Sequence, residues 1–162
     1  MKKRMQIVIG SLAMVACFAW NQSQALAQAE QFKVNSTVTN RTYLEPPVVE
    51  QVGSLTRLTV HVSYTQLCSD PRLEGTMEVT GVWLIDPRNV TSVGHGEWTS
   101  ACTMGGVIEG TWCMDKSGTM RGIGFVTGGD FDGALLHSVS VAGDPFLGWM
   151  VYEAWLLLPA SE

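Results

Sequence analysis

From residue 31 onward, apolar residues recur at every second position rather than at the spacing of a helix. In residues 73–85 the odd positions read Leu, Gly, Met, Val, Gly, Trp and Ile, whereas the even positions begin with alternating Glu and Thr. Residues 58–64 and 108–114 alternate in the same way. Because successive side chains of a strand point to opposite faces, this pattern predicts strands with one buried and one solvated face.

Turn-forming residues separate these strands at short intervals. The breaks contain Pro, Gly, Asp and Asn and fall near residues 46, 70, 87, 105, 117, 129 and 144. No convincing helical pattern follows residue 29. About eight antiparallel strands joined by short turns predict an all-β fold, either a closed up-and-down barrel or a β-sandwich.

Glycines on the apolar strand faces favour the barrel. By the parity of their strands, five glycines share a face with apolar residues: Gly75, Gly81, Gly110, Gly122 and Gly124. Glycine weakens a flat strand, but it permits the sharp bends and close approaches that a small barrel needs. We therefore prefer the barrel over the sandwich.

The first 29 residues have the features of a secretory signal peptide. Three basic residues at positions 2–4 precede an uncharged apolar run of 16 residues, and small-x-small cleavage sites follow at 25–29. The run is shorter than the roughly 20 residues of a membrane-spanning helix. We expect residues 1–29 to be removed, residues 30–162 to form one barrel domain without an integral membrane segment, and the protein to be secreted or periplasmic.

The charge of the remaining chain limits its partners. Without the three basic signal residues, seven Lys and Arg stand against fifteen Asp and Glu, a formal charge of −8. No basic cluster exists, so nucleic acid and anionic membrane surfaces are poor partners. Glu74, Glu78 and Glu109 lie within strands on the face that lipid would contact, which argues against an outer-membrane barrel.

Three cysteines remain after the signal peptide: Cys68, Cys102 and Cys113. Their spacing matches no zinc pattern, and we expect no metal site. In an up-and-down barrel, the loop that holds Cys68 and the turn at residues 105–106 fall at the same end. The sequence therefore predicts a Cys68–Cys102 disulfide with Cys113 free.

The glycine-rich stretch RGIGFVTGGDFDGALLH, residues 121–137, allows several interpretations. Its glycine spacing is one residue away from the dinucleotide fingerprint, but no helix follows to receive the phosphates. Asp130 and Asp132 loosely resemble a calcium turn that lacks most of its ligands. We instead predict two strands, residues 119–127 and 131–142, joined by a tight turn, and we expect no cofactor.

The segment TGGDFDGA, residues 127–134, resembles the Gly-Gly-x-x-Phe-x-Gly turn of the allene oxide cyclase and dirigent-like barrels, a calycin-like group of eight-stranded barrels. The likeness covers about fifteen residues and the general rhythm of the strands. It implies a barrel that binds small hydrophobic molecules in its interior, as members of that group do. No catalytic residue of the group matches a position in this chain.

Two ionisable residues are candidates for catalysis. The last strand, residues 147–159, is apolar on both faces, and Glu153 shares one of them with Trp149 and Trp155. If that face points inward, burial makes Glu153 a candidate general acid or base; the alternative is a rim position that reaches water or an arginine. His137 shares an apolar face with its neighbours and is either a hydrogen-bonded core residue or the partner of Glu153 in one cavity.

The aromatic residues suggest where a ligand would bind. Indole and phenyl faces lining a cup suit a flat apolar molecule, and the candidates are Trp83, Trp112, Trp149, Trp155 and Phe131. The favoured function is therefore a secreted barrel that binds a small hydrophobic molecule. Two alternatives stay open: a cofactor-free cyclase or isomerase, and a protein-interaction module with a filled core that dimerises through its last strand.

Overall fold

The computed structural model describes residues 31–89 and 91–159. The signal peptide predicted over residues 1–29 lies outside the described residues. Residues 31–158 form one compact unit, which is described by itself below. None of the helices within the described ranges has the length and hydrophobicity needed to cross a membrane.

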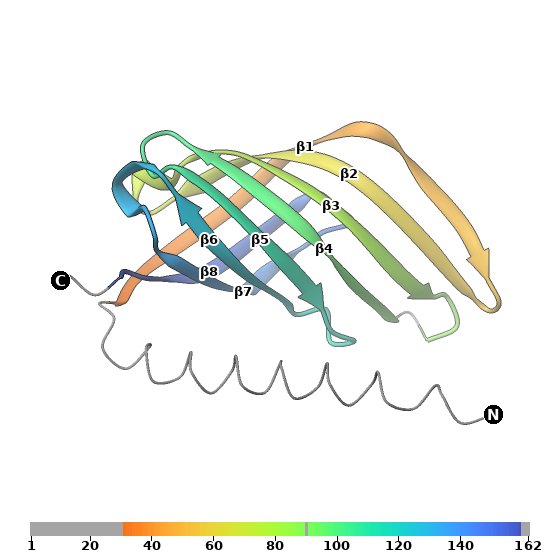
Figure 1. Cartoon of the computed structure of the whole chain (residues 1–162). Helices are drawn as coiled ribbons and strands as arrows, with labels where there is room; N and C mark the ends of the chain where they lie inside the picture. Colours follow the sequence, from red (N-terminus) through yellow and green to blue (C-terminus); the bar gives the residue numbers. More distant parts are fainter. Residues whose placement is uncertain (1–30, 90, 160–162) are drawn as a thin grey trace, which may run out of the picture. The chain divides into compact units, whose positions relative to one another are not determined.

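The described chain forms eight antiparallel strands that close into a barrel (Figure 1). Each strand pairs with the next in sequence, and the first pairs with the last. The strands are β1 (Gln31–Val52), β2 (Leu55–Cys68), β3 (Gly75–Asp86), β4 (Thr91–Cys102), β5 (Val107–Met114), β6 (Met120–Thr127), β7 (Leu135–Asp144) and β8 (Trp149–Leu157). The predicted up-and-down barrel is confirmed, and the sandwich is not formed.

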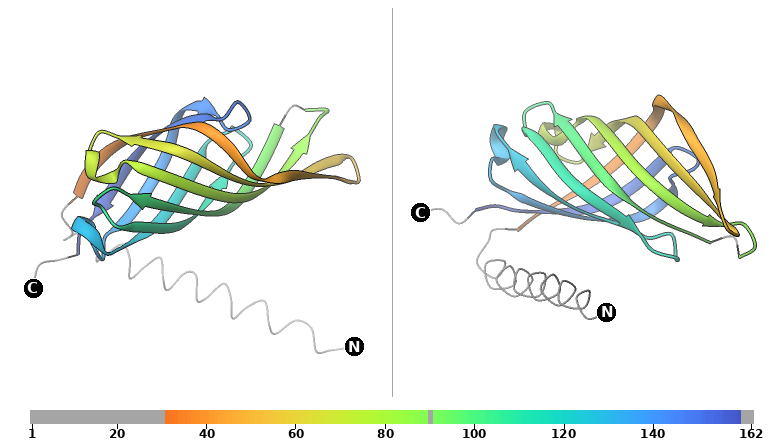
Figure 2. Two further views of the ribbon diagram at one scale, coloured as in Figure 1. Left: turned by 90° about the horizontal axis from the view of Figure 1, so that it is seen from above. Right: turned by 45° about the vertical axis from the view of Figure 1, so that its right-hand side comes forward.

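The two ends of the barrel differ. At what we call the closed end, two short 3-10 turns, η1 (Pro71–Leu73) and η2 (Gly129–Phe131), bury Leu73 and Phe131. At the opposite, open end, β1 and β2 form a long hairpin that β3 and β4 accompany and that extends beyond the part of β1 paired with β8 (Figures 1 and 2). β1 pairs with β8 only over residues 31–38, whereas it pairs with β2 as far as Val52.

Tryptophans occupy the space that the inner-face glycines leave. A Cβ atom at Gly81 would lie 2.2 Å from Cζ2 of Trp112, and one at Gly124 would lie 2.7 Å from Cζ2 of Trp98. These contacts cross from β3 to β5 and from β6 to β4. The glycines on the apolar faces therefore let large indole rings approach the opposing backbone, which explains their position in the sequence pattern.

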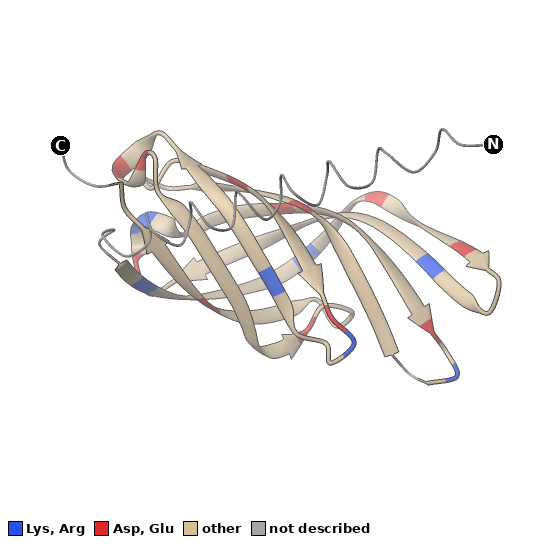
Figure 3. Ribbon diagram, turned by 60° about the horizontal axis from the view of Figure 1, so that its bottom comes forward, with Lys and Arg blue, Asp and Glu red and all other residues tan. Residues whose placement is uncertain are grey.

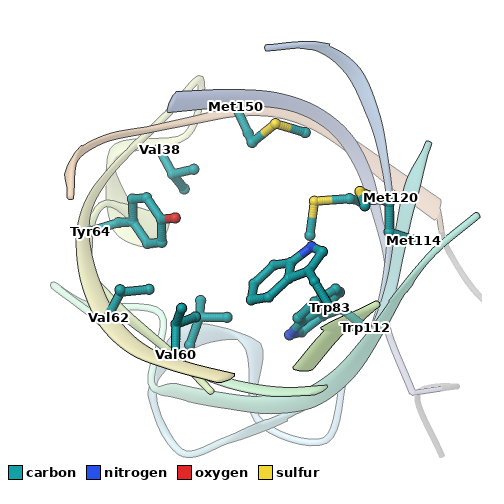
Figure 4. Close-up of a cluster of buried hydrophobic side chains, with 10 residues drawn as sticks. Val38, Val60, Val62, Tyr64, Trp83, Trp112, Met114, Met120 and Met150 are labelled. Carbon is teal, nitrogen blue, oxygen red and sulfur yellow. The ribbon is translucent and has the colours of Figure 1, made fainter. Parts of the chain in front are cut away.

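The barrel core consists of two clusters of buried side chains. The open-end cluster contains three methionines, Met114, Met120 and Met150, and the indoles of Trp83 and Trp112 (Figure 4). The closed-end cluster is mostly aliphatic; its fully buried members are Val34, Leu73, Ile108, Val126 and Leu156. Trp98 packs against both clusters.

The strand predicted over residues 131–142 is wrong at its start. Gly128 and Gly129 have φ angles of 71° and 69°, and the segment coils into η2 instead of continuing as a strand. The Asp132 carboxylate accepts a hydrogen bond of 2.6 Å from the Gly128 N–H and fixes the turn. β7 therefore begins only at Leu135, and the residue that joins Phe131 in the closed-end core is Leu136, not His137.

Candidate functional site

A small cavity lies inside the barrel between the two core clusters. Its volume is about 80 Å³, and its wall is mostly apolar. Both clusters contribute to the wall, including Val34, Ile108 and Leu136 from the closed-end side and Val79, Trp112 and Met120 from the open-end side. Two small residues in its wall, Gly122 and Ala154, leave space beside the larger side chains of Trp98, Trp112 and Tyr152.

The polar groups in the cavity wall are neutral. The Gln66 amide donates a hydrogen bond of 2.8 Å to the Leu73 carbonyl and accepts one of 2.7 Å from Ser100. Burial raises the pKa of the Tyr152 hydroxyl, and the nearby Tyr64 raises it further, so this phenol stays protonated at physiological pH. Its oxygen lies 3.7 Å from the Met120 sulfur, a weak acceptor.

Arg121 also borders the cavity, but its charge lies outside the barrel. Its side chain is 58 % exposed, and its Nη1 lies 2.7 Å from an Asp115 carboxylate oxygen. Lys and Arg are few and scattered in the view of the described barrel in Figure 3, where Asp and Glu are more frequent. The interior therefore suits a neutral, largely apolar molecule better than an ion.

A second cavity, of about 50 Å³, lies at the open end. Tyr43, Tyr64, Trp83 and Phe146 contribute to its wall. Arg41 closes one side, because its Nη1 donates a hydrogen bond of 2.7 Å to the Pro145 carbonyl and so joins β1 to the β7–β8 turn. This cavity lies on the side of the open-end cluster that faces the hairpin and the turn.

The outer face of β2, β3 and β4 carries an open groove. Its wall includes His61 and His95, and His61 lies 3.4 Å from Glu45 and 3.8 Å from Glu78. Among the described residues no group of three potential metal ligands comes together. The groove is open to solvent and has both polar and apolar residues in its wall.

Glu153 and His137 do not line the interior. On β8 the residues that belong to the two core clusters are Met150, Ala154 and Leu156, which gives Glu153 the opposite, outward parity; Leu157, at the end of the strand, is buried as well. Glu153 lies 3.1 Å from Lys33 Nζ, and its side chain is 36 % exposed. His137 pairs with Trp155, whereas Glu153 pairs with Val139, so the two candidates face outward on neighbouring strands. Of the two alternatives for Glu153, the structure shows the one in which the carboxylate reaches water and a cation, here Lys33, and the inward acid–base pair is not formed.

The predicted aromatic residues fall into three places. Trp83 and Trp112 point into the open-end cluster with ring centroids 4.7 Å apart. Phe131 plugs the closed end, where the Arg72 guanidinium lies 4.4 Å from its ring centroid. Trp149 and Trp155 have outward parity on β8 and are not interior residues.

Of the five predicted aromatic residues only Trp112 lines the interior cavity, and the two other aromatic residues of its wall, Trp98 and Tyr152, were not predicted. Trp98 follows Gly94 and Gly96 at even positions, opposite in parity to the polar residues His95 and Glu97. The even position of Trp98 could therefore have placed its side chain inside the barrel. Tyr152 gave no such signal, because β8 is apolar on both faces.

The predicted disulfide is not formed in the structure. Cys68 and Cys102 are half-buried free thiols at the closed end, and Cys113 is an exposed free thiol. Gly75 pairs with Cys102 on one side and with Gln66 on the other, so β3 separates the two strands that carry the thiols. Burial, and secondarily the proximity of Cys68, raises the pKa of Cys102 to about 11.

An apolar surface covers the outside of β6, β7 and β8. Phe125, Val141 and Trp149 are 52 %, 55 % and 42 % exposed. His137 lies on the outer side of β7, and its Nε2 is buried without a hydrogen-bond partner in the described structure. The doubly apolar last strand is thus packed on the inside and partly exposed on the outside.

Comparison of the chain with protein-family models and with curated proteins gives no match in either case.

Proposed function

We propose that the barrel binds a small, neutral and largely apolar molecule in its interior, and that it does so after export from the cytoplasm. The cavity between the two core clusters carries this proposal. Its wall is apolar, its polar groups are uncharged, and it lies within a closed barrel that excludes water. The resemblance of residues 127–134 to calycin-like barrels supports the same class of ligand. The charged start of residues 1–29 supports export.

The size of the cavity limits the ligand. A cavity of about 80 Å³ is roughly half the size of an engineered apolar cavity of ~150 Å³ that stays dry and binds benzene. The methionines at its border, Met77 and Met120, have flexible unbranched side chains that can make room for more atoms. We therefore expect ligands of about the size of a six-membered ring, bound with displacement of a methionine.

The cyclase or isomerase alternative lacks its proposed residues. Glu153 and His137 both face outward. The ionisable groups that line the cavity from inside are Tyr152 and Cys68, and burial raises the pKa of both. Neither is a strong base near neutral pH, so binding is better supported than proton transfer.

Thermal unfolding in the presence of benzene tests the proposed binding. Because a ligand that binds only the folded state stabilises it, saturating benzene should raise the melting temperature of the wild-type protein. Ala154→Leu fills the cavity from β8 and should abolish the shift. Ala101→Leu adds the same atoms at an exposed position on β4 and should keep it. An equal shift in both variants would exclude the cavity as the binding site.

The outer apolar surface of β6–β8 favours a second function, a module that pairs with another copy of this chain. Exposed Phe125 and Trp149 and the unpartnered His137 Nε2 would then be covered at the contact. Light scattering coupled to gel filtration tests this. A dimer that Trp149→Gln converts to a monomer would support it, and a monomeric wild-type protein at high micromolar concentration would exclude it.

A further inference from the structure

The two indoles at the centre of the open-end cluster use their N–H groups differently. Trp112 donates a hydrogen bond of 3.2 Å to the Thr80 carbonyl. Trp83 is only 5 % exposed, and its Nε1 is buried without a partner among the described residues. A buried donor without an acceptor is destabilising, and native proteins contain few of them. The Trp83 N–H is therefore an uncommitted donor inside the barrel.

The surroundings of the Trp83 nitrogen offer it no strong acceptor. A Cβ atom at Gly94 would lie 2.9 Å from this nitrogen, so the absence of a side chain at Gly94 leaves the N–H edge uncovered on that side. In Figure 4 the nitrogen points toward the side of the barrel that carries Met120. A thioether sulfur is a weak acceptor on a flexible chain, and a better acceptor can replace it at small cost.

Trp83 borders the open-end cavity, and its side-chain neighbours reach the interior cavity. It contributes to the wall of the open-end cavity of about 50 Å³, and its neighbours Trp112 and Met120 border the interior cavity of about 80 Å³. Rotation of the Met120 side chain would extend the interior cavity toward the open-end cavity. A ligand that occupies the interior from the open end then passes along the edge of the Trp83 indole.

We propose that the bound molecule carries a neutral hydrogen-bond acceptor, such as a ketone oxygen, which receives the N–H of Trp83. This inference rests on the proposed function and narrows the ligand class from apolar molecules in general to apolar carbonyl compounds. The ring of the ligand contacts Met120 and Trp112, and its oxygen takes the place of the missing acceptor. A carboxylate is disfavoured in the interior cavity, because the cationic residue that borders this cavity, Arg121, is exposed and already paired with Asp115.

A pair of probes of the same shape tests the inference. Cyclohexanone and methylenecyclohexane share one ring and differ in an oxygen against a CH₂ group. In the wild-type protein we expect the ketone to bind about fivefold to tenfold more tightly, the ratio that an ordinary neutral hydrogen bond gives. In Trp83→Phe both probes should bind equally. Trp155→Phe, which removes an indole N–H on the outward side of β8, should keep the preference for the ketone.

The wild-type protein alone supplies a second readout. In ¹H–¹⁵N spectra with assigned indole signals, cyclohexanone should shift the Trp83 Nε1–H resonance downfield, and methylenecyclohexane should not. Equal affinity for the two probes in the wild type, or a ketone preference that survives in Trp83→Phe, would overturn the inference and leave the proposed binding intact. If neither probe binds the wild-type protein, both the inference and the proposed function are wrong.

Discussion

At the scale of single residues, close contacts between glycine and tryptophan determine how the barrel interior is filled. Trp112 reaches the backbone of β3 because Gly81 has no side chain, and Trp98 reaches β6 because Gly124 has none. Each indole ring therefore packs directly against the backbone. A larger residue in place of the glycine would keep the ring away from that backbone. The interior cavity lies beside these two indole rings, which both contribute to its wall.

Gly81→Ala should destabilise the protein. The new methyl group would lie 2.2 Å from Trp112 Cζ2, so the indole must move in a packed cluster. We expect the free energy of unfolding to fall by about 1–3 kcal/mol, the usual cost of overpacking a core. Urea denaturation measures this change. Thr80→Ala, at the exposed neighbouring position, is the control and should have a smaller effect; an equal loss would mean that the Trp112 contact is unimportant.

The three thiols should differ in reactivity. Because burial raises the pKa of Cys102 from 9.0 to about 11, its thiolate fraction at pH 8 falls by roughly 100-fold, and the thiolate is the reactive form. In reduced protein, iodoacetamide should therefore label exposed Cys113 well before Cys102. Mass spectrometry of tryptic peptides over time gives the rates. Labelling of Cys102 as fast as Cys113 would contradict the buried position of the Cys102 thiol.

At the scale of elements, the closed end is held by contacts between its two 3-10 turns. Asp70 accepts hydrogen bonds from the backbone and side chain of Arg72, and Arg72 covers the ring of Phe131 from the other turn. Arg72 Nη1 also lies 3.5 Å from Asp130. One arginine thus connects η1 to η2 and positions the plug residues Leu73 and Phe131.

Asp70→Asn should lower stability near neutral pH by about 1 kcal/mol, the typical value of a side-chain cap. Hydrogen bonds from Arg72 hold the pKa of Asp70 below its usual value of 3.8. A lowered pKa stabilises the folded state above pH 4 and loses this effect as the pH falls through the folded-state value. The difference between variant and wild type should therefore shrink below pH 4.

Urea denaturation at pH 7 and pH 3 tests this dependence, with Asp130→Asn as the control. Asp130 is 44 % exposed and lies farther from Arg72, so its replacement should change stability less. A stability difference for Asp70→Asn that is the same at both pH values would show that the carboxylate charge is not responsible.

The alternation of apolar and polar residues predicted the strands, and the short turns between them predicted their order. In a barrel, alternate side chains of a strand point inward and outward, so the alternation also predicts which side chains face inward. The assignment failed where parity carries no information. β8 is apolar at both parities, so Glu153 and Trp155 could be placed on either side, and the structure puts them outside. The 3-10 turn η2 interrupts the alternation of inward and outward side chains before β7 begins. His137 therefore faces outward. The backbone conformation at Gly128 and Gly129, rather than hydrophobicity, therefore determines which side chains of β7 face inward and which face outward.

At the scale of the whole molecule, the function depends on whether the interior is hollow. A period of two shows which side chains face inward, but not how much space they enclose, so the cavity could not be predicted from the sequence. The cavity depends on how the side chains fill the interior. The indoles of Trp83 and Trp112 belong to the open-end cluster, aliphatic residues fill the closed end, and the small residues Gly122 and Ala154 line the cavity. Small differences in these volumes separate a binding barrel from a filled one.

The most direct test of the binding proposal is the mass of the protein purified from its own export route, measured first under native and then under denaturing conditions. We predict a native mass that exceeds the denatured mass by one small, neutral molecule, released when the barrel unfolds. The Ala154→Leu variant should show no such excess. Equal native and denatured monomer masses, or a dimer without any additional mass, would contradict the proposal that the barrel carries a ligand in its interior.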